Sequence, residues 1–332
     1  MKEKLILSME IISSYFKNRK INKLDVIYVI LAHKNPEQLK RLINRLDAPA
    51  TSFYIHIDEN QILKTFEKAL NRFKNTSILK NEDRFSGVWG DIGIVKATLA
   101  AMRKKGFVVL LSGQDYPLQN NEKIRSFFSK NKESHFITAY PIPHAQLDQG
   151  GLPRINQYKI NKSYKRGHFL FLNSIFESKF YSLETAGKLN FLRKSGNWTG
   201  IFKIFKRRKF PKYLKPYAGS QWWALSTQTI KKIIEFIEKY PEYLEYHRYS
   251  LLPDEMFFQS IIIHIKEAHK SEIKKSLTYV NWERPTGPLP VTFKKEDFQE
   301  LEKASKNYLF ARKFDMEQDA EILDEIDKEL LN

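Results

Sequence analysis

The sequence predicts an α/β fold in which helices flank a central sheet that is mixed but mostly parallel. Three observations lead to this class. In the first third of the chain, short β-branched apolar runs alternate with helical patterns in the order β-α-β-α-β. Of the 332 residues, 42% are hydrophobic and 14% aromatic, which is sufficient for a real core. No internal repeat or low-complexity linker occurs, so one domain with insertions is the simplest organisation.

Five elements account for the first third of the chain. Residues 25–35 form a β-branched apolar run that ends in polar residues, as in a buried strand. Apolar residues at helical spacing over 36–46, with a proline at the first position, predict a helix. Residues 51–60 alternate and end on an acidic cluster, which predicts a second strand. A helix over 91–105 and a third strand over 106–118 that runs into a turn complete the pattern.

The rest of the chain adds irregular insertions and further helices. Residues 141–215 are less regular. A strand over 219–226 and a helix over 227–240 with a Ser/Thr cap follow. Residues 250–264 predict a loop and then a buried helix, and the chain closes with an acidic helix over 320–331.

The N-terminal residues 1–23 predict a short amphipathic helix. Their apolar residues are broken by Glu3, Lys4, Glu10 and Lys17, so no run approaches the roughly 20 apolar residues of a membrane span. No signal-peptide pattern with a small-residue cleavage site is visible.

The charge balance suggests an anionic partner. The chain has 56 Lys and Arg against 38 Asp and Glu, a net charge of +18, which suits nucleic acid, anionic lipid or a phosphorylated substrate. A Lys-rich proteome is the plain alternative explanation. Residues 202–217 interleave aromatic residues with Lys and Arg, which suits nucleic acid or a bilayer surface, although a solvated face is the default for a lone charge run.

Several motifs are absent from the sequence. There are no cysteines, which excludes disulfides, a thiolate nucleophile and a zinc–sulfur site. No D-x-D occurs, so nothing indicates a divalent cation held by paired aspartates on a diphosphate. The absence of H-x-x-x-H, phosphate-loop, dinucleotide-fingerprint and G-x-S-x-G motifs disfavours zinc, nucleotide-triphosphate, dinucleotide and hydrolase-elbow sites.

Candidate site residues lie first at the ends of the predicted strands. Ligands of parallel sheets bind at the carboxyl ends of the strands, and here those ends carry His33, Asp58 and Asp115. Asp254 and Glu255 are predicted in the first turn of a helix, where the macrodipole alone favours acidic residues. A functional Glu255 would be held ionised by the same dipole and would accept a proton.

Aromatic and cationic residues supply the other candidates. Trp222, Trp223 and Trp282 are each more often core residues than sugar platforms. In the stretch FARKFD, residues 310–315, two cations lie between phenylalanines. They suit either snorkelling over an apolar face or a site that holds a strongly negative group.

Together, eight segments resemble the Core-2/I-branching glycosyltransferases, which include the peptide-O-xylosyltransferases. In chain order they are VIYVILAHKNPEQLKRLI, YIHIDEN, VWGDIGIVKATLAAM, FVVLLSGQDYPL, GSQWWALS, PDEMFFQSIIIH, YVNW and LFARKFD. The resemblance runs from about residue 24 to about residue 325, and its strength lies in the shared order of the segments.

The resemblance implies a GT-A-type nucleotide-sugar-binding fold and an inverting, metal-independent transferase. The donor would be a UDP-sugar carrying GlcNAc or xylose, and the acceptor a hydroxyl of a glycan. The expectation of surface polysaccharide or lipopolysaccharide synthesis comes from the absent membrane anchor and not from the resemblance. The resemblance further implies that 24–332 is a single domain, with a nucleotide-binding half at 24–145 and an acceptor half at 146–332 that ends in the phosphate-binding segment. No cofactor is expected beyond the donor.

The resemblance also assigns roles to residues of the donor site. Glu255 matches the general base, and Arg312 and Lys313 match the two cations that contact the UDP diphosphate in place of a metal. Asp58 would contact the nucleoside, and His33 would line the nucleotide pocket.

Other matched residues concern the sugar and the acceptor. Trp89 would lie near the donor sugar and Trp282 near the acceptor. Asp115, Gln221 and Trp222 are further candidates for acceptor or sugar binding. Gln221 occupies a position that holds an aspartate in the xylosyltransferase branch, which leaves the donor and acceptor identities open.

The family's animal members carry an N-terminal anchor and disulfides that this chain lacks, so we expect a bacterial cytoplasmic enzyme. A peripheral position on the inner membrane face, through 202–217 and near a lipid-linked saccharide acceptor, is compatible with this. The alternative is a basic nucleic-acid-binding or peripheral membrane protein without the activity. Nucleic acid is disfavoured because basic residues occur along the chain and no recognised nucleic-acid module is present.

Overall fold

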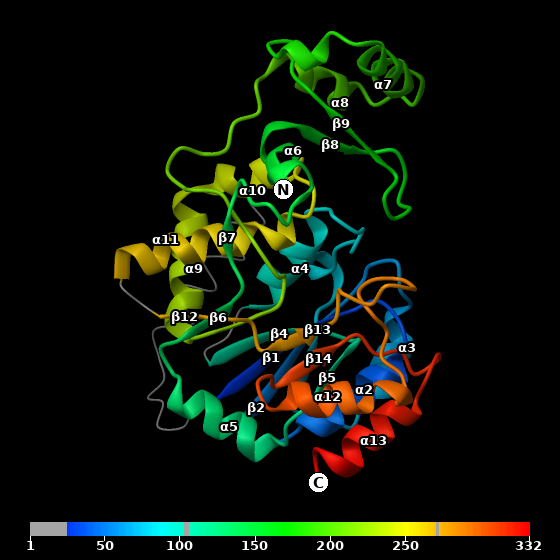
Figure 1. Ribbon diagram of the computed structural model, residues 1–332, viewed down its shortest axis with the longest axis vertical. Helices are drawn as coiled ribbons and strands as arrows, with labels where there is room; N and C mark the ends of the chain where they lie inside the picture. Colours follow the sequence, from blue (N-terminus) through cyan, green and yellow to red (C-terminus); the bar gives the residue numbers. More distant parts are fainter. Residues whose placement is uncertain (1–24, 103–105, 270–271) are drawn as a thin grey trace.

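A seven-stranded sheet forms the centre of the protein (Figure 1). The computed structural model describes residues 25–102, 106–269 and 272–332, so the helix predicted over 1–23 lies outside the described residues. In spatial order the strands are β12 (Ile273–Lys274), β6 (His135–Ile137), β11 (Trp223–Leu225), β4 (Phe107–Ser112), β1 (Val26–Ala32), β2 (Thr51–Ile57) and β3 (Thr76–Ile78).

The pairing of the strands confirms the predicted class. β1 runs parallel to β2 and β4, β2 to β3, and β12 to β6. Only β11 is antiparallel to its neighbours in this sheet, β4 and β6. The sheet is therefore mixed and mostly parallel. Its strands come from both the 24–145 and the 146–332 half, so the two halves share one sheet.

Helices cover both faces because the central strands are apolar on both sides. Alternate residues of β1 enter two separate core clusters: Tyr28 and Ile30 face one layer, whereas Ile27 and Val29 face the other. The first layer contains α2 (Pro36–Leu46), α3 (Leu63–Leu70), α5 (Asn121–Lys130), α12 (Phe298–Ser305) and α13 (Glu321–Glu329). The second contains α4 (Gly93–Ala101), α9 (Thr227–Lys239), α10 (Pro241–His247) and α11 (Phe257–His269).

The predicted strand over 106–118 is in fact two strands in two sheets. β4 ends at Ser112, whose N–H and Oγ both donate to the carboxylate of Asp115, at 2.9 and 2.6 Å. This short-range bonding closes a turn. The chain then enters β5 (Asp115–Pro117), which joins β13 (Thr278–Val280) and β14 (Phe310–Arg312) in the order β13-β14-β5.

Other predicted boundaries also change. The strand predicted over 219–226 is limited to β11, because Gly219–Trp222 form no ladder and bond instead to neighbouring segments. The helix predicted over 91–105 begins at Gly93 and ends at Ala101.

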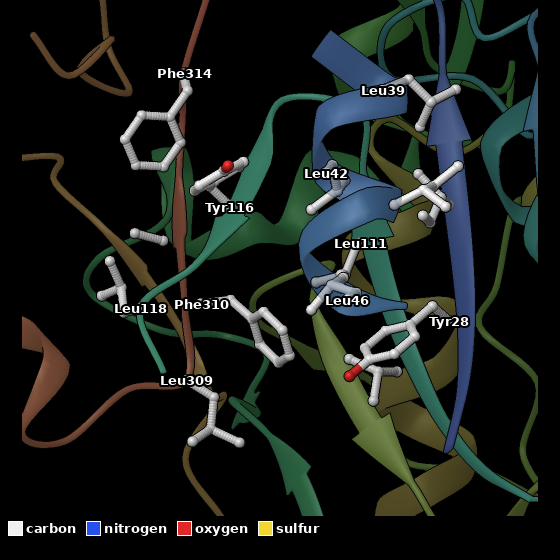
Figure 2. Close-up of a cluster of buried hydrophobic side chains, with 14 of the residues drawn as sticks. Tyr28, Leu39, Leu42, Leu46, Leu111, Tyr116, Leu118, Leu309, Phe310 and Phe314 are labelled. Atoms are coloured by element: carbon white, nitrogen blue, oxygen red, sulfur yellow. The ribbon is translucent and has the colours of Figure 1, made fainter. Parts of the chain in front are cut away.

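The second sheet packs on α2 and the central sheet through large buried side chains (Figure 2). The ring of Phe310 meets that of Tyr28 edge-on at 6.3 Å, and Phe314 meets Tyr116 at 6.0 Å. Since Phe310 and Phe314 are fully buried, the residues between them are held at a fixed place above the end of β4. The phenylalanines of FARKFD are therefore anchors for its two cations.

Residues 157–209 form a projecting lobe (top of Figure 1). It contains the antiparallel pair β8 (Tyr158–Asn161) and β9 (Phe169–Leu172), then α7 (Leu183–Lys194) and α8 (Trp198–Phe202). Before the lobe lies α6 (Leu152–Asn156), and β7 (Tyr140–Pro141) pairs with β10 (Tyr217–Ala218). The lobe has a small core of its own, built from Tyr158, Ile160, Leu170, Leu172, Leu192 and Ile204.

The basic-aromatic stretch 202–217 is not one surface, contrary to the expectation from its composition. Phe202 and Phe205 are exposed on the lobe, but Arg208 is buried and donates to the carbonyls of Arg154 and Gln157, both at 2.8 Å. Further along, Leu214 is buried in the second core cluster. A buried guanidinium needs several acceptors, so the second half of the stretch is structural. Among the described residues, no helix has the length and apolar character needed to cross a bilayer.

Candidate active site

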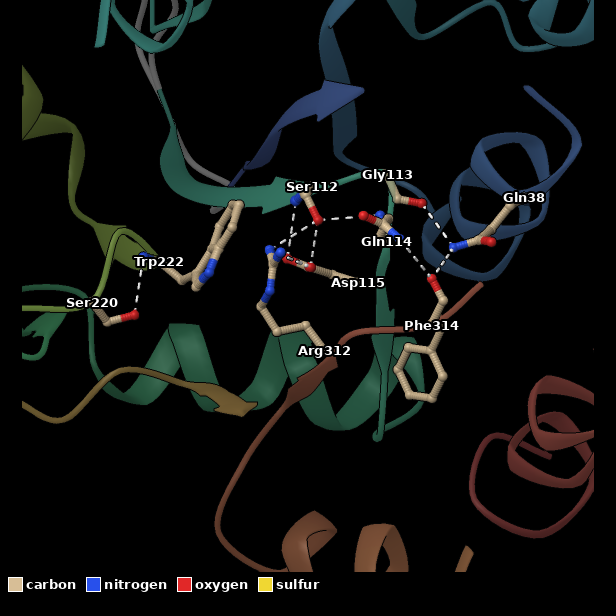
Figure 3. A network of polar contacts seen from close by, with 9 residues as sticks. All are labelled: Gln38, Ser112, Gly113, Gln114, Asp115, Ser220, Trp222, Arg312 and Phe314. Atoms are coloured by element: carbon tan, nitrogen blue, oxygen red, sulfur yellow. Dashed lines mark hydrogen bonds and ion pairs between the residues drawn. The ribbon is translucent and has the colours of Figure 1, made fainter. Parts of the chain in front are cut away.

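Arg312 lies at the junction of the two sheets (Figure 3). It pairs with Asp115 in the ladder between β14 and β5. Its Nη1 donates to Asp115 Oδ1 and to Ser112 Oγ, each at 3.1 Å, and its guanidinium lies 4.2 Å from the centre of the Trp222 ring. The guanidinium plane is thus fixed from one side by a carboxylate and from the other by an indole.

Asp115 and Trp222 lie behind Arg312. Asp115 is 0% exposed, and both its oxygens accept hydrogen bonds from Ser112 or Arg312. Burial raises the pKa of the Asp115 carboxyl, and the nearby guanidinium opposes this shift. Trp222 is buried as well. Rather than presenting free groups to a sugar, the two residues hold Arg312.

Lys313 has no counterion among the described residues. Its side chain is half-buried and makes no hydrogen bond or ion pair with any residue that the structure describes. Burial lowers the pKa of its ammonium, and nearby cations lower it further. These cations are Arg312, Arg166 and Lys34, of which Lys34 is paired with Asp315 at 2.6 Å. Neither Lys313 nor Arg166 forms an ion pair with a described residue, and a group of cations with unpaired members is the electrostatic signature of an anion site.

His33 and Asp58 follow β1 and β2, and the Asp58 N–H donates to the carbonyl of Ala32 at 2.9 Å. The Asp58 carboxylate accepts from the backbone N–H groups of Asn60 and Gly87, at 2.8 and 2.6 Å. A Cβ on Gly87 would lie 2.7 Å from that carboxylate, so a larger residue here would displace the Asp58 side chain. Partial burial and nearby cations lower the pKa of His33, whereas Asp58 opposes this shift. The His33 ring is therefore neutral at pH 7.

Trp89 lies in the loop that Asp58 ties down through Gly87. Its ring is half-buried and stacks against the guanidinium of Arg166, 4.9 Å from the ring centre. Arg166 belongs to the connection between β8 and β9 of the projecting lobe. The lobe therefore reaches the cation cluster around Lys313.

Glu255 ends a 3-10 turn, η5 (Pro253–Glu255), and lies before α11 rather than inside its first turn. Met256 has non-helical backbone angles, which separates the turn from α11. Glu255 Oε2 accepts from Arg154 Nη1 at 2.9 Å. Burial raises the pKa of Glu255, and Arg154 opposes without cancelling the shift. Glu255 does not lie in the first turn of α11, so the predicted role of the helix dipole is corrected: burial and Arg154 are the main influences on the pKa of this carboxyl.

Asp254 is buried beside Glu255. Its Oδ1 has no hydrogen-bond partner among the described residues, and burial, with the charge of Glu255, raises its pKa to about 7. The ammonium of Lys159 is buried nearby, 3.7 Å from Asp91, and opposes this shift. The two adjacent acids thus differ in access: Glu255 is partly exposed and Asp254 is not.

Residues Gly219–Trp222 connect the carboxylate to the cations. The Gly219 N–H donates to the carbonyl of Glu255 at 2.9 Å, while Trp222 stacks on Arg312. A Cβ on Gly219 would lie 1.8 Å from the carbonyl oxygen of Thr138, so this contact requires glycine. The Cα atoms of residues 219 and 222 are at most about 11 Å apart. Glu255, next to Gly219, and Arg312, next to Trp222, therefore belong to one site. Gln221 lies half-buried between them.

Trp282 stands apart from this arrangement. It follows β13 by two residues, is 57% exposed and, within the described residues, makes no hydrogen bond or ring contact with the other candidates. Metal ligands are likewise not clustered: no group of three or more His, Asp or Glu side chains suited to an ion occurs among the described residues. Metal independence remains a prediction.

Comparison with known proteins adds the family. The sequence model of the Core-2/I-branching enzyme family matches residues 26–304, which is most of the chain. The chain belongs to the Core-2/I-branching enzyme family. This membership agrees with the resemblance inferred from the eight segments, and the family is one of glycosyltransferases.

Curated relatives of this Core-2/I-branching enzyme include xylosyltransferases. Xylosyltransferase 2 of Rattus norvegicus is 23% identical over 91% of this chain and 33% of its own length. Xylosyltransferase oxt of Drosophila melanogaster is 25% identical over 84% of this chain and 30% of its own length. The chain thus spans about a third of the length of these relatives.

Solved structures resemble the chain only distantly. One is 4-diphosphocytidyl-2C-methyl-D-erythritol synthase from Anaerococcus prevotii, with 10% identity, a TM-score of 0.35 and coverage of 85% of this chain and 96% of that chain. Another is the bifunctional glycosyltransferase WbbM in its apo form, with 9% identity, a TM-score of 0.34 and coverage of 89% and 46%. We base no argument on these similarities.

The structure of this Core-2/I-branching enzyme adds positioning residues that sequence reasoning missed. Gln38 is buried on α2, and its Nε2 donates to the carbonyls of Gly113 and Phe314, both at 3.0 Å (Figure 3). It ties the end of β4 to the segment after Lys313. The sequence signal that could have identified Gln38 was a polar residue on the buried face of the helix predicted over 36–46. Arg154 lies in an irregular stretch and gave none.

Proposed function

We propose that this chain is an inverting, metal-independent glycosyltransferase. It transfers a GlcNAc- or xylose-like sugar from a UDP-sugar to a hydroxyl of a glycan acceptor, in the synthesis of a surface polysaccharide. One observation carries the proposal: Glu255, a partly exposed carboxylate, lies at one end of the segment 219–222, and Arg312 lies at the other end, next to Lys313, which has no counterion among the described residues.

The cation end serves the leaving group. When the bond between the sugar C1 and the β-phosphate oxygen breaks, the electron pair stays on UDP, and negative charge grows on the β-phosphate. Lys313 is free to receive that charge, and Arg312 adds a fixed guanidinium beside it. Because both cations are oriented before the reaction, little reorganisation is needed as the charge develops.

The carboxylate end serves the nucleophile. The acceptor oxygen attacks C1 from the face opposite UDP, and its proton passes to Glu255. Oε2 of Glu255 is engaged with Arg154, so the other oxygen, Oε1, is the one that accepts the proton. A raised pKa makes a carboxylate a better base, provided that it is ionised at the working pH. Attack from the opposite face inverts the configuration at C1.

A thermal-shift screen of UDP-sugars in the presence of EDTA tests the donor and the metal independence together. A ligand that binds only the folded protein raises its melting temperature by mass action. We expect one UDP-sugar to raise it more than UDP alone. Stabilisation that appears only when Mn²⁺ is added contradicts metal independence, and no response to any UDP-sugar contradicts the donor class.

The configuration at C1 of the product tests inversion. We expect NMR of the glycan product to show a β-linked sugar from an α-linked UDP donor. An α-linked product contradicts the single-displacement mechanism.

The predicted cytoplasmic location needs its own test, and fractionation of cells that produce the full-length protein supplies it.

A further inference from the structure

The projecting lobe carries most of the excess charge of the protein. Residues 157–209 contain 13 Lys and Arg but only two acidic residues, Glu177 and Glu184, a net charge of +11 out of the +18 of the whole chain. The lobe is about a sixth of the sequence. Most of the excess positive charge of the protein therefore lies in one projecting structure, whose position is seen in Figure 1.

The same lobe exposes large apolar side chains. Of the eleven large hydrophobic side chains that are exposed in the described part of the chain, seven belong to it: Tyr164, Phe176, Tyr181, Leu183, Trp198, Phe202 and Phe205. Leu183 is 94% exposed and Tyr181 75%. Soluble monomeric surfaces seldom gather apolar side chains in this way, and such gatherings mark interaction sites.

Contacts within the lobe bring several of these side chains together. The Ile175 N–H donates to the carbonyl of Ile204 at 2.9 Å, which places Phe176 and Phe205 on neighbouring segments. The rings of Phe202 and Phe205 are 6.5 Å apart.

Two further contacts extend this patch. The Arg207 guanidinium lies 5.8 Å from the ring of Phe176 and donates to the Phe176 carbonyl. Tyr181 Oη donates to the Ile175 carbonyl at 2.9 Å, and Leu183 follows two residues later at the start of α7. The outer end of the lobe is thus an apolar surface with cations interleaved.

We propose that this outer end of the lobe docks on the surface of an anionic phospholipid bilayer. Aromatic and leucine side chains enter the boundary between headgroups and acyl chains, while Lys and Arg contact the lipid phosphates. Single-stranded nucleic acid fits the cations and stacks on aromatic rings, but an exposed leucine such as Leu183 gains nothing from bases or a phosphate backbone. The combination therefore favours a bilayer.

Docking also has a consequence for the proposed transferase site. The connection between β8 and β9 carries Arg166, which stacks on Trp89 beside the cation cluster. A docked lobe therefore connects the donor end of the site to the membrane, where an acceptor attached to a lipid would lie. This consequence rests on the proposed function, whereas the docking itself does not.

Vesicle co-sedimentation of the full chain tests the proposal. We expect binding to phosphatidylcholine vesicles that contain phosphatidylglycerol and much weaker binding to phosphatidylcholine alone. A variant with Leu183→Ser, Phe202→Ser and Phe205→Ser is expected to bind about tenfold more weakly. Replacing Lys179, Arg193 and Lys194 by Gln is expected to cost about fivefold per charge and to reduce the preference for anionic lipid.

The control variant is Ile62→Ser, which removes an apolar side chain that is 72% exposed but lies outside the lobe. It should bind vesicles as the parent protein does. All these positions are exposed, so unchanged melting temperatures will show that the fold is intact. Failure of the parent protein to bind anionic vesicles, or equal binding by the serine variant, overturns the proposal.

A parallel arm separates nucleic acid from lipid. Fluorescence anisotropy with a labelled single-stranded oligonucleotide should show weaker binding than the vesicles do at the same salt concentration. Tighter binding to the oligonucleotide that depends on the lobe cations overturns the bilayer proposal in favour of nucleic acid. Vesicle binding needs no sugar donor. If the protein binds vesicles but no UDP-sugar raises its melting temperature, the proposed function is refuted and the docking proposal is not.

Discussion

The two ends of the candidate site bury charge in opposite ways. At the cation end, Arg312 has Asp115 and Lys34 has Asp315, but Lys313 has no counterion among the described residues. At the carboxylate end, the accessible acid is the paired one, whereas the acid without a hydrogen-bond partner on Oδ1, Asp254, is buried. Glu255 is paired with Arg154 yet is the accessible acid.

Access, more than pairing, decides which unpaired charge has a function. Lys313 is half-buried and can meet a ligand, whereas Asp254 is closed off from solvent and can take up only a proton, with its pKa raised to about 7. In the proposed function, substrate supplies the missing counterion of Lys313, whereas Asp254 binds a proton. The contrast predicts that substitutions at Lys313 act on substrate binding, whereas substitutions at Asp254 act on stability.

The largest expected effect is that of Glu255→Gln. The amide keeps the shape but cannot accept the proton, so kcat should fall by about 10²- to 10⁴-fold. The melting-temperature shift caused by UDP should persist, because the proposed function places UDP at the other end of the site. Glu122→Gln, an exposed position on α5, is the matched control. Undiminished transfer by the Glu255→Gln variant removes the base from the mechanism.

The second-largest effect is expected from Lys313→Ala, which should weaken binding of the donor and leave the base unchanged. Loss of a charged contact to phosphate is expected to weaken UDP binding by about 10- to 100-fold, as measured by calorimetry. Lys303→Ala on α12, an exposed lysine, serves as the control. Unchanged affinity in the Lys313→Ala variant would show that the unpaired cation is not the phosphate ligand. Equal losses in both variants would indicate only a general field effect.

Arg154→Ala sharpens the comparison through pH. Arg154 favours the charged form of Glu255, so its removal raises the pKa of Glu255 further. The base must be deprotonated, and the acid limb of kcat/KM should therefore move to higher pH. We expect a loss of up to about tenfold at pH 6 that largely recovers at pH 9. A uniform loss at every pH would assign Arg154 a positioning role instead.

Asp254→Asn should have the smallest effect on activity and a visible one on stability. Burial raises the pKa of Asp254 to about 7, so the folded protein binds more protons than the unfolded chain between the ordinary carboxyl pKa and 7. Stability contributed by this residue therefore falls as pH rises through that window. Asparagine removes the dependence and should raise the free energy of unfolding by about 1–2 kcal/mol at pH 8.

Urea unfolding at pH 4.5 and pH 8 measures this effect. At pH 4.5, where Asp254 is already protonated in the folded protein, the variant and the parent should differ little. A variant that is less stable than the parent at both values would mean that the charge of Asp254, held by Lys159, stabilises the fold.

Local patterns were sufficient for much of the fold. The apolar run of β1, the helical spacing of α2 and the capped helix α9 appear where their sequences predict them. These patterns work because the period of the apolar residues states which face of an element is buried. They failed where side chains bond over short range, as at Ser112, where a predicted strand becomes two.

The sequence by itself determined the family, the order of the elements and the candidates Glu255, Arg312 and Lys313. Only the tertiary structure decided what surrounds them. Arg312 meets Ser112 across 200 positions of the chain, and Arg154 reaches Glu255 across 101. Whether a charge is paired, buried or free depends on which distant segments approach it, and no local period of the sequence encodes that approach. The excess of cations in residues 157–209 can be counted in the sequence, but the exposure of the apolar side chains beside them became visible only once the chain had folded.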